Sequence, residues 1–325
     1  MDALPMKTSR SLFQQWAKDG RLYAILSAAG FSLKAVFVKL GYAAGPVDAL
    51  TLLTLRMGIA LPLFAWLLWL SRSDGQAPLG KMDAVRILLL GMFGYYLSSL
   101  FDFYGLEYIS TGLERLILYV YPTLVLVFQM IASRKRPAVR TVQAMAICYL
   151  GLGIAFVHDL GVAGHGTQVW TGAAWVFASA VTYALYYLGT GAMVKRLGSM
   201  RLAGLAGGAS SILVLAHYLL AGTPAKLATL PPAIWLHSTL MAVLSTVLPV
   251  YWMALAIQRM GATQAAAVGN LGPVLTMFAS WALLGEPLSA FQLGGLALVM
   301  FGVSRLKPAP AAAPADAVVT EKAMA

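Results

Sequence analysis

Two stretches of the chain resemble one another: LERLILYVYPTLVLVFQMIA at residues 113–132 and QAAAVGNLGPVLTMFASWAL at residues 264–283. A shift of 151 residues aligns them and places Pro122 on Pro273. Leucine, alanine and glycine residues also coincide at this shift, within and after the two stretches. Proline and glycine shape helices more strongly than other residues, so their coincidence within matching apolar runs predicts an internal repeat.

Both stretches belong to apolar blocks that recur along the 325-residue chain. Hydrophobic residues make up 60% of the sequence and charged residues 11%, whereas soluble domains carry roughly 25% charged residues. Blocks of about twenty apolar residues are long enough to cross a hydrocarbon core of roughly 30 Å as helices. We predict ten such helices, at residues 22–41, 47–70, 85–105, 112–132, 138–157, 169–194, 202–221, 234–257, 262–284 and 289–306.

The basic residues predict the orientation of these helices in the membrane. With the N-terminus placed in the cytoplasm, the cytoplasmic connections hold Lys7, Arg10, Lys18, Arg21, Arg72, Lys81, Arg86, Arg134, Lys135, Arg136, Arg140, Lys195, Arg196, Arg201, Arg259, Arg305, Lys307 and Lys322. The opposite connections hold Lys226 and few other basic residues, together with Asp48, Asp159 and Glu286. This bias predicts that both termini of a multi-pass protein of the inner (plasma) membrane are cytoplasmic.

The predicted fold class is therefore an all-α integral membrane protein with ten transmembrane helices. Because five helices is an odd number, the second five-helix repeat (169–306) starts on the opposite side of the membrane from the first (22–157), so the repeats are inverted. Residues 1–21 form a cytoplasmic segment without a signal-peptide cleavage pattern. Residues 307–325 are rich in Ala and Pro and are predicted to be a disordered cytoplasmic tail.

Composition and motifs also exclude several classes of function. The net charge of +11 lies mostly in short cytoplasmic connections, which predicts membrane orientation and no nucleic-acid partner. The single cysteine, Cys148, is expected to be a packing residue, and the four histidines lack metal-ligand spacing. The sequence has no P-loop and no G-x-S-x-G motif. We therefore predict no catalytic residues, no metal and no cofactor.

One motif of the second half connects the chain to a known family. Residues 272–289 read GPVLTMFASWALLGEPLS, and residues 121–137, YPTLVLVFQMIASRKRP, form a weaker counterpart in which Arg134, Lys135 and Arg136 replace the Gly-Glu-Pro corner. With the two five-helix halves, this pattern resembles the EamA-type members of the drug/metabolite transporter superfamily over about residues 22–306. The resemblance implies a ten-helix bundle around a central cavity, a small-metabolite substrate that is often exported, and a frequent basic position at Arg56.

Charged residues within the predicted spans are the main site candidates, because each costs roughly 2.5–3.5 kcal/mol in a membrane unless it is paired or hydrated. They are Lys34, Arg56, Asp102, Glu114 and Arg115, all in the first repeat. Two interpretations remain open. The residues form structural ion pairs, Arg56 or Lys34 with Glu114 or Asp102, or Lys34, Arg56 and Arg115 bind an anionic or zwitterionic substrate while Glu114 or Asp102 exchanges protons.

Four uncharged residues complete the predicted substrate site. Tyr119 lies one helical turn beyond Arg115, and Tyr186 lies near the repeat equivalent of Lys34. Trp252 and Asn270 are the other second-half candidates, and Asn270 lies beside the Gly272-Pro273 step. The expected site is therefore basic on one wall and neutral on the other.

The preferred function is a secondary transporter that exports a small polar metabolite by alternating access. Its predicted partners are that metabolite and the lipid bilayer. The Gly204-x-x-x-Gly208 pattern is compatible with packing within the chain or with a homodimer. Two alternatives are a membrane-embedded enzyme that acts on a lipid-linked phosphate and a receptor or partner subunit that transports nothing.

Overall fold

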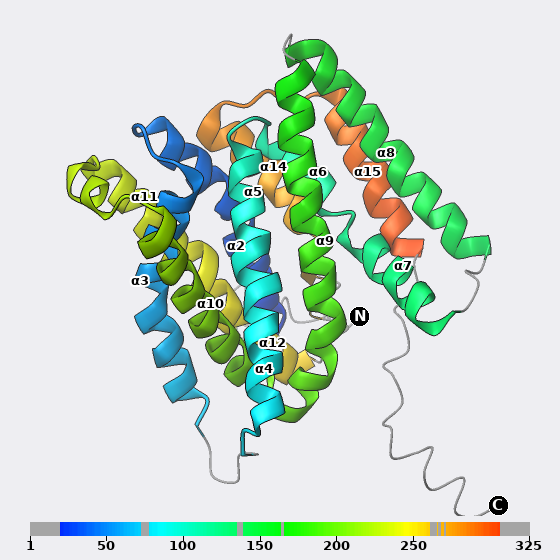
Figure 1. The fold of residues 1–325 in the computed structure, drawn as a ribbon. Helices are drawn as coiled ribbons and strands as arrows, with labels where there is room; N and C mark the ends of the chain where they lie inside the picture. The colour runs from blue at the N-terminus through cyan, green and yellow to red at the C-terminus, as the bar shows by residue number, and fades with distance from the viewer. Residues whose placement is uncertain are drawn as a thin grey trace, which may run out of the picture.

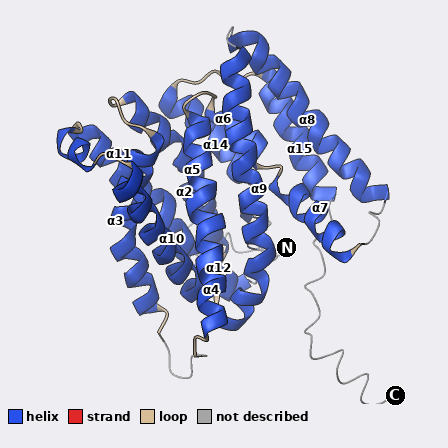
Figure 2. Cartoon of the chain, viewed as in Figure 1, coloured by secondary structure: helices blue, strands red, loops and turns tan. Residues whose placement is uncertain are grey.

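The fold was analysed in a computed structural model that describes residues 20–72, 78–134, 139–163, 166–260, 265, 268–269 and 271–305. Every regular element in these residues is a helix (Figure 2). The predicted N-terminal segment, the predicted tail and Asn270 lie outside the described residues.

The helices follow the predicted blocks closely (Figure 1). The first half contains α2 (Arg21–Ala43), α3 (Ala49–Leu70), α4 (Lys81–Gly91), the π-helical segment η1 (Met92–Leu97), α5 (Ser98–Leu106), α6 (Thr111–Leu118), α7 (Tyr121–Ser133) and α8 (Val139–Ala163). The second half contains α9 (Gly166–Leu197), α10 (Ser199–Ala221), the 3₁₀ helix η2 (Pro224–Thr229), α11 (Pro232–Ala242), the π-helical segment η3 (Val243–Val247), α12 (Leu248–Met260), α14 (Gly272–Leu284) and α15 (Ala290–Arg305).

Seven helical segments of the described residues are long and apolar enough to cross a membrane. They are Arg21–Ala43, Ala49–Leu70, Lys81–Leu106, Thr111–Ala132, Val139–His158, Ser199–Ala221 and Pro232–Met260. The predicted spans at 262–284 and 289–306 correspond to the shorter apolar helices α14 and α15, and the span at 169–194 lies within α9. Length and composition thus indicate a multi-pass membrane protein.

The structure repeats itself at the offset found in the sequence. The helices α11, η3, α14 and α15 each begin 151 residues after α4, η1, α7 and α8, respectively. Pro122 and Pro273 each occupy the first turn of a helix, where a missing N–H removes no helical hydrogen bond. The chain therefore breaks between α6 and α7, immediately before Pro122, where the sequence predicted one kinked helix.

The backbone at the ends of α7 and α14 follows the same rule. Arg134 ends α7 with φ 52°, and Gly285 ends α14 with φ 67°, so both residues adopt the left-handed conformation. A glycine adopts this conformation without steric cost, whereas an arginine does not. The Gly-Glu-Pro corner of the second half is thus matched in backbone shape by the basic corner of the first half.

The fifth helices of the two halves, α8 and α15, lie side by side (Figure 1). A Cβ atom at Gly151 would lie 2.6 Å from the Gly295 carbonyl oxygen, and one at Gly302 would lie 2.8 Å from that of Ala144. The 151-residue shift maps Gly151 onto Gly302 and Ala144 onto Gly295. The contact is therefore repeated with the halves exchanged, as expected for two repeats related by a pseudo-two-fold axis.

The first helix of each half packs on the other half. Helix α2 contacts α11, η3, α12 and α14, and α9 contacts α5, η1, α6 and α7. The largest buried apolar cluster includes Leu52, Met57, Phe64 and Phe103. Gly204 of α10 lies against the backbone of α3, so its small size serves packing within the chain; a homodimer stays a prediction.

Candidate functional site

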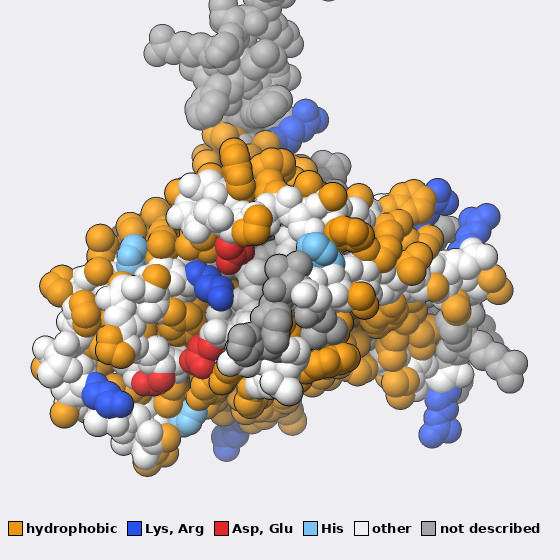
Figure 3. Space-filling view, turned by 90° about the horizontal axis from the view of Figure 1, so that it is seen from above, with side chains coloured by type: hydrophobic (Ala, Val, Ile, Leu, Met, Phe, Trp, Pro, Cys, Tyr) orange, Lys and Arg blue, Asp and Glu red, His pale blue; other side chains and the backbone are white. Residues whose placement is uncertain are grey.

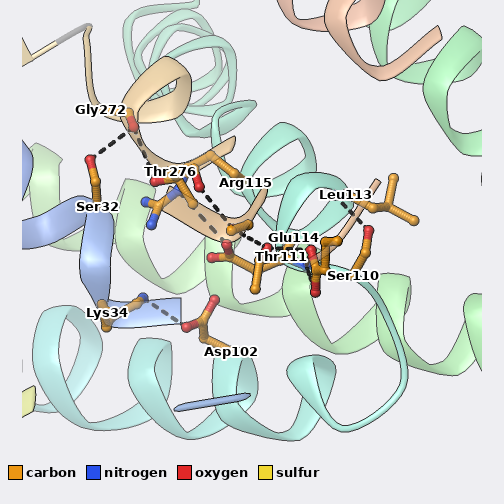
Figure 4. A network of polar contacts seen from close by, with 12 residues as sticks. Ser32, Lys34, Asp102, Ser110, Thr111, Leu113, Glu114, Arg115, Gly272 and Thr276 are labelled. Carbon is orange, nitrogen blue, oxygen red and sulfur yellow. Dashed lines mark hydrogen bonds and ion pairs between the residues drawn. The ribbon is translucent and has the colours of Figure 1, made fainter. Parts of the chain in front are cut away.

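Four charged side chains from α2, α5 and α6 gather inside the bundle (Figure 4). Lys34 Nζ lies 2.7 Å from Asp102 Oδ2. Arg115 Nε lies 3.7 Å from Glu114 Oε2, because the long Arg115 side chain reaches back to its neighbour. The carboxyl groups of Asp102 and Glu114 lie within hydrogen-bonding distance of one another. We call these four residues the charged quartet.

The quartet is almost completely removed from solvent. The side chains of Asp102 and Glu114 are 0% exposed, and those of Lys34 and Arg115 are 16% and 13% exposed. Two cations and two anions balance, which a low-dielectric interior requires of buried charges. The sequence interpretation that pairs Lys34 with Asp102 therefore matches the geometry.

Hydrogen bonding within the quartet is incomplete. Both carboxyl oxygens of Glu114 are buried without a hydrogen-bond donor among the described residues, and so are Nε and Nη2 of Arg115 without an acceptor. A buried polar group left unpaired costs about 1–3 kcal/mol, and a charged group costs more. Unused acceptors thus lie beside unused donors at one buried point.

The Gly-Glu-Pro corner positions the helix that carries Glu114 and Arg115. Glu286 Oε2 accepts hydrogen bonds from Thr111 N at 3.2 Å and from Thr111 Oγ1 at 2.6 Å. Thr111 Oγ1 also contacts Ser280 Oγ, and Ser110 Oγ accepts from Leu113 N at 3.2 Å. These bonds satisfy the free N–H groups at the start of α6 and fix that helix to α14 and the loop after it.

Arg56 lies in α3 and makes a separate set of contacts. Its Nε donates to Thr246 Oγ1 at 2.8 Å, and its Nη1 donates to Ser99 Oγ at 3.2 Å. The guanidinium carbon lies 5.6 Å from the centre of the Phe103 ring. Arg56 is 5% exposed and forms none of the ion pairs found among the described residues. The sequence did not predict Thr246 or Ser99, because small hydroxyl residues are ordinary components of membrane helices.

Two of the uncharged candidates belong to a cluster of tyrosine rings. Tyr119, Tyr121, Tyr183, Tyr186 and Tyr95 form a chain of ring contacts with centroids 5.0–6.2 Å apart. The cluster joins α9 to η1 and to the α6–α7 break, one helical turn beyond Arg115. Trp252 is half-buried in α12 and takes part in none of the ring contacts found in the described residues.

Two cavities lie at the end of the bundle where α3 and α6 begin. One has a volume of about 420 Å³ and is lined by Asp48, Thr51, Glu107 and Lys226, among others. The second has a volume of about 240 Å³ and is lined by residues that include Ser110, Leu113, His158, Glu286 and Gln292. From above, acidic and basic side chains gather among hydrophobic ones on this end of the molecule (Figure 3). Neither cavity reaches the quartet in this conformation.

Comparison with known proteins agrees with the two-half organisation. The model of the EamA-like transporter family matches residues 19–157 and again residues 170–306. The uncharacterized transporter YcbK of Bacillus subtilis (strain 168) is 30% identical over 302 residues, which cover 90% of this chain and 93% of YcbK. The uncharacterized transporter YyaM of the same organism is 26% identical over 296 residues, which cover 88% of this chain and 93% of YyaM.

A solved structure, titled only as the crystal structure of a protein, has the same fold. It superposes with a TM-score of 0.59 at 16% sequence identity and covers 88% of this chain and 95% of that one. At this identity the likeness concerns the fold alone.

Proposed function

We propose that this chain, which belongs to the EamA-like transporter family, is a secondary transporter that exports a small zwitterionic or anionic metabolite. In this proposal the substrate binds at the charged quartet of Lys34, Asp102, Glu114 and Arg115. The chain spans the inner (plasma) membrane ten times with both termini in the cytoplasm, as the distribution of its basic residues favours.

The incomplete hydrogen bonding of the quartet is the observation that carries the proposal. The Glu114 oxygens lack donors, and the adjacent Arg115 nitrogens lack acceptors. A substrate ammonium group supplies donors for Glu114, and a substrate carboxylate supplies acceptors for Arg115. A molecule that carries both groups a few ångströms apart, such as an α-amino acid, satisfies both residues and leaves the net charge of the site unchanged.

The two repeats supply the machinery for alternating access. Because α2 and α9 each pack on the opposite half, a rocking motion of one half against the other changes the surroundings of Lys34 on α2. Transporters built from inverted repeats commonly bind substrate between the repeats near the middle of the membrane. In the conformation described here, the quartet is closed off from both cavities, which corresponds to an occluded state.

The adjacent carboxyl groups of Asp102 and Glu114 favour coupling to protons. Two carboxylates in contact repel one another, so the pair is most stable when one proton is shared between them. An incoming ammonium group takes over the role of that proton at Glu114. Substrate and proton thereby compete for the same carboxyl group, which is the requirement for exchange of one against the other.

The arrangement of the cations disfavours the alternative of an enzyme that holds a lipid-linked phosphate. Lys34 is paired with Asp102, and Arg115 lies beside Glu114. Arg56 donates to two hydroxyl groups instead. Three cations that face different partners do not form one anion site, and a phosphate would compete with two buried carboxylates for them.

Counterflow in sealed liposomes tests the proposal. Purified protein is reconstituted into phosphatidylethanolamine–phosphatidylglycerol vesicles loaded with an unlabelled mixture of L-amino acids, and entry of the ¹⁴C-labelled mixture is measured. We expect accumulation above protein-free vesicles. We also expect simple amines and simple carboxylic acids to compete less well than amino acids, because each satisfies only one half of the site.

A negative result distinguishes among the alternatives. The substrate class is wrong if neither an amino-acid mixture nor a mixture of organic acids and sugar phosphates enters the vesicles. Consumption of an added lipid-linked phosphate by the same vesicles would favour the enzyme alternative.

A further inference from the structure

Each half contains one π-helical segment, and the two segments occupy equivalent positions. The segment η1 begins at Met92 within the continuous helix 81–106, and η3 begins at Val243 within 232–260, 151 residues later. A π segment interrupts the regular ladder of helical hydrogen bonds, and such interruptions commonly mark functional sites. The third helix of each half therefore has a built-in weak point.

A serine hydroxyl ties the other half to the helix just after each weak point. Ser27 of α2 donates to the Pro249 carbonyl oxygen at 2.7 Å, and Ser179 of α9 donates to the Ser98 carbonyl oxygen at 2.8 Å. Pro249 and Ser98 are 151 residues apart and follow η3 and η1, respectively. The first helix of each half thus holds the third helix of the other half beside its π segment.

Arg56 breaks this symmetry, because it stabilises only η3. Thr246 Oγ1 accepts from Arg56 Nε and donates to the Met241 carbonyl oxygen at 2.9 Å. This second bond reaches back five residues and satisfies a carbonyl oxygen beside the π segment. The 151-residue shift places Gly207 at the position of Arg56 and Tyr95 at that of Thr246. The described structure offers η1 no equivalent arginine–threonine contact.

Helix α5 connects Arg56 to the charged quartet. Arg56 contacts Ser99 and Phe103, and Asp102 lies between them on the same helix. A change in the position of α5, caused by substrate or a proton at Asp102, therefore reaches the guanidinium group directly. From there it reaches Thr246 in the other half of the molecule.

We infer that Arg56 is a positioning residue that latches the π segment η3 through Thr246, and that this latch opens in each transport cycle. This inference rests on the proposed transport function and assigns Arg56 a role away from direct substrate contact. The latch holds the conformation described here, and its release lets the 232–260 helix bend at η3.

Thr246→Val tests the latch with little change in shape, because valine has nearly the size of threonine but no hydroxyl group. Thr54→Val is the matched control. Thr54 is also buried, 4% exposed, and its hydroxyl has no hydrogen-bond partner in the described structure. Amide hydrogen exchange of residues 243–248 in the full-length protein should accelerate about tenfold in Thr246→Val and remain unchanged in Thr54→Val.

Counterflow of the ¹⁴C-labelled amino-acid mixture separates a latch from a merely structural contact. In Thr246→Val we expect the maximal rate to rise at least threefold and the half-saturating concentration to remain unchanged. In an Arg56→Lys background, Thr246→Val should have no further effect, because the two residues act through one bond.

Several results would overturn the inference. These are unchanged exchange and rate in Thr246→Val, a raised half-saturating concentration with an unchanged rate, or additive effects of the two substitutions. If the wild-type protein transports nothing, the proposed function and the cycle of the latch fail. The exchange experiment then still decides whether Arg56 and Thr246 hold η3.

Discussion

Lys34 Nζ lies 2.7 Å from Asp102 Oδ2, and this ion pair joins α2 to α5 in the interior of the bundle. The Asp102 carboxyl group is completely buried and also touches the carboxyl group of Glu114. Lys34 therefore supplies the cation that allows two acidic groups to occupy one buried site. Its helix packs on the second half of the molecule, so the pair lies where the two halves meet.

Lys34→Met should abolish transport and also destabilise the protein. Removing one partner of a buried ion pair leaves an uncompensated charge and costs about 3–5 kcal/mol. The double variant Lys34→Met/Asp102→Leu should regain most of this stability without regaining transport. Thermal unfolding of the purified protein and counterflow in vesicles measure the two effects.

Lys226→Met is the control for loss of a lysine, since Lys226 is exposed on η2. It should change neither stability nor transport. A Lys34→Met protein that is less stable but still transports at the wild-type rate would show that the pair serves structure alone.

Glu286→Ala should destabilise the start of α6 by about 1–2 kcal/mol, the usual effect of losing a helix N-terminal partner. Glu286→Gln should cost less, because the amide oxygen can still accept from Thr111. Amide hydrogen exchange of residues 111–116 checks the local effect. Equal exchange in both variants and in the wild type would mean that Glu286 does not hold α6.

Arg134→Gly should stabilise the protein by about 0.5–1 kcal/mol, because glycine adopts a positive φ without steric cost. Arg134→Ala is the matched control. It removes the same charge but keeps the Cβ atom, so it should bring no gain. An equal rise in the thermal midpoint of both variants would assign the effect to charge instead of backbone strain.

Glu107→Gln should stabilise the protein near neutral pH and have no effect in acid. Partial burial, and to a smaller extent the Asp48 carboxylate, raise the pKa of Glu107, although its bond from Ala49 N acts in the opposite direction. A raised pKa means that the folded state binds the proton more tightly than the unfolded state, so stability is lost as pH rises through the folded pKa. Glutamine cannot ionise and avoids this loss.

Thermal midpoints of Glu107→Gln and the wild type, measured across pH, check this prediction. The difference should disappear below about pH 4, the ordinary range of a glutamate pKa. A difference that stays constant from pH 4 to 8 would contradict the assigned cause.

The sequence predicted the helices well, because apolar length and proline positions act locally. The predicted span 22–41 became Arg21–Ala43, and 202–221 became Ser199–Ala221. The 151-residue repeat of Pro122 and Pro273 reappeared as the equal start of α7 and α14. The pairing of Lys34 with Asp102 was one of the pairings that the sequence allowed, since charges within spans need partners.

Other features depend on contacts between distant helices and left no local signal. The π segments η1 and η3 lie in ordinary apolar sequence, and Arg56 binds Thr246 across 190 residues of chain. Glu286 belonged to a motif, but its bond to Thr111 depends on how α14 and α6 meet. The predicted role of Asn270 stays a prediction, because that residue lies outside the described residues.

The most direct test of the central claim is equilibrium binding of the ¹⁴C-labelled amino-acid mixture to the purified protein, with Glu114→Gln compared against Glu107→Gln. Both substitutions remove one carboxylate, but only Glu114 belongs to the quartet. We predict that Glu114→Gln weakens binding at least about tenfold, the loss of one charge-assisted hydrogen bond, and that Glu107→Gln binds like the wild type. Equal binding by all three proteins would contradict the placement of the substrate at the quartet.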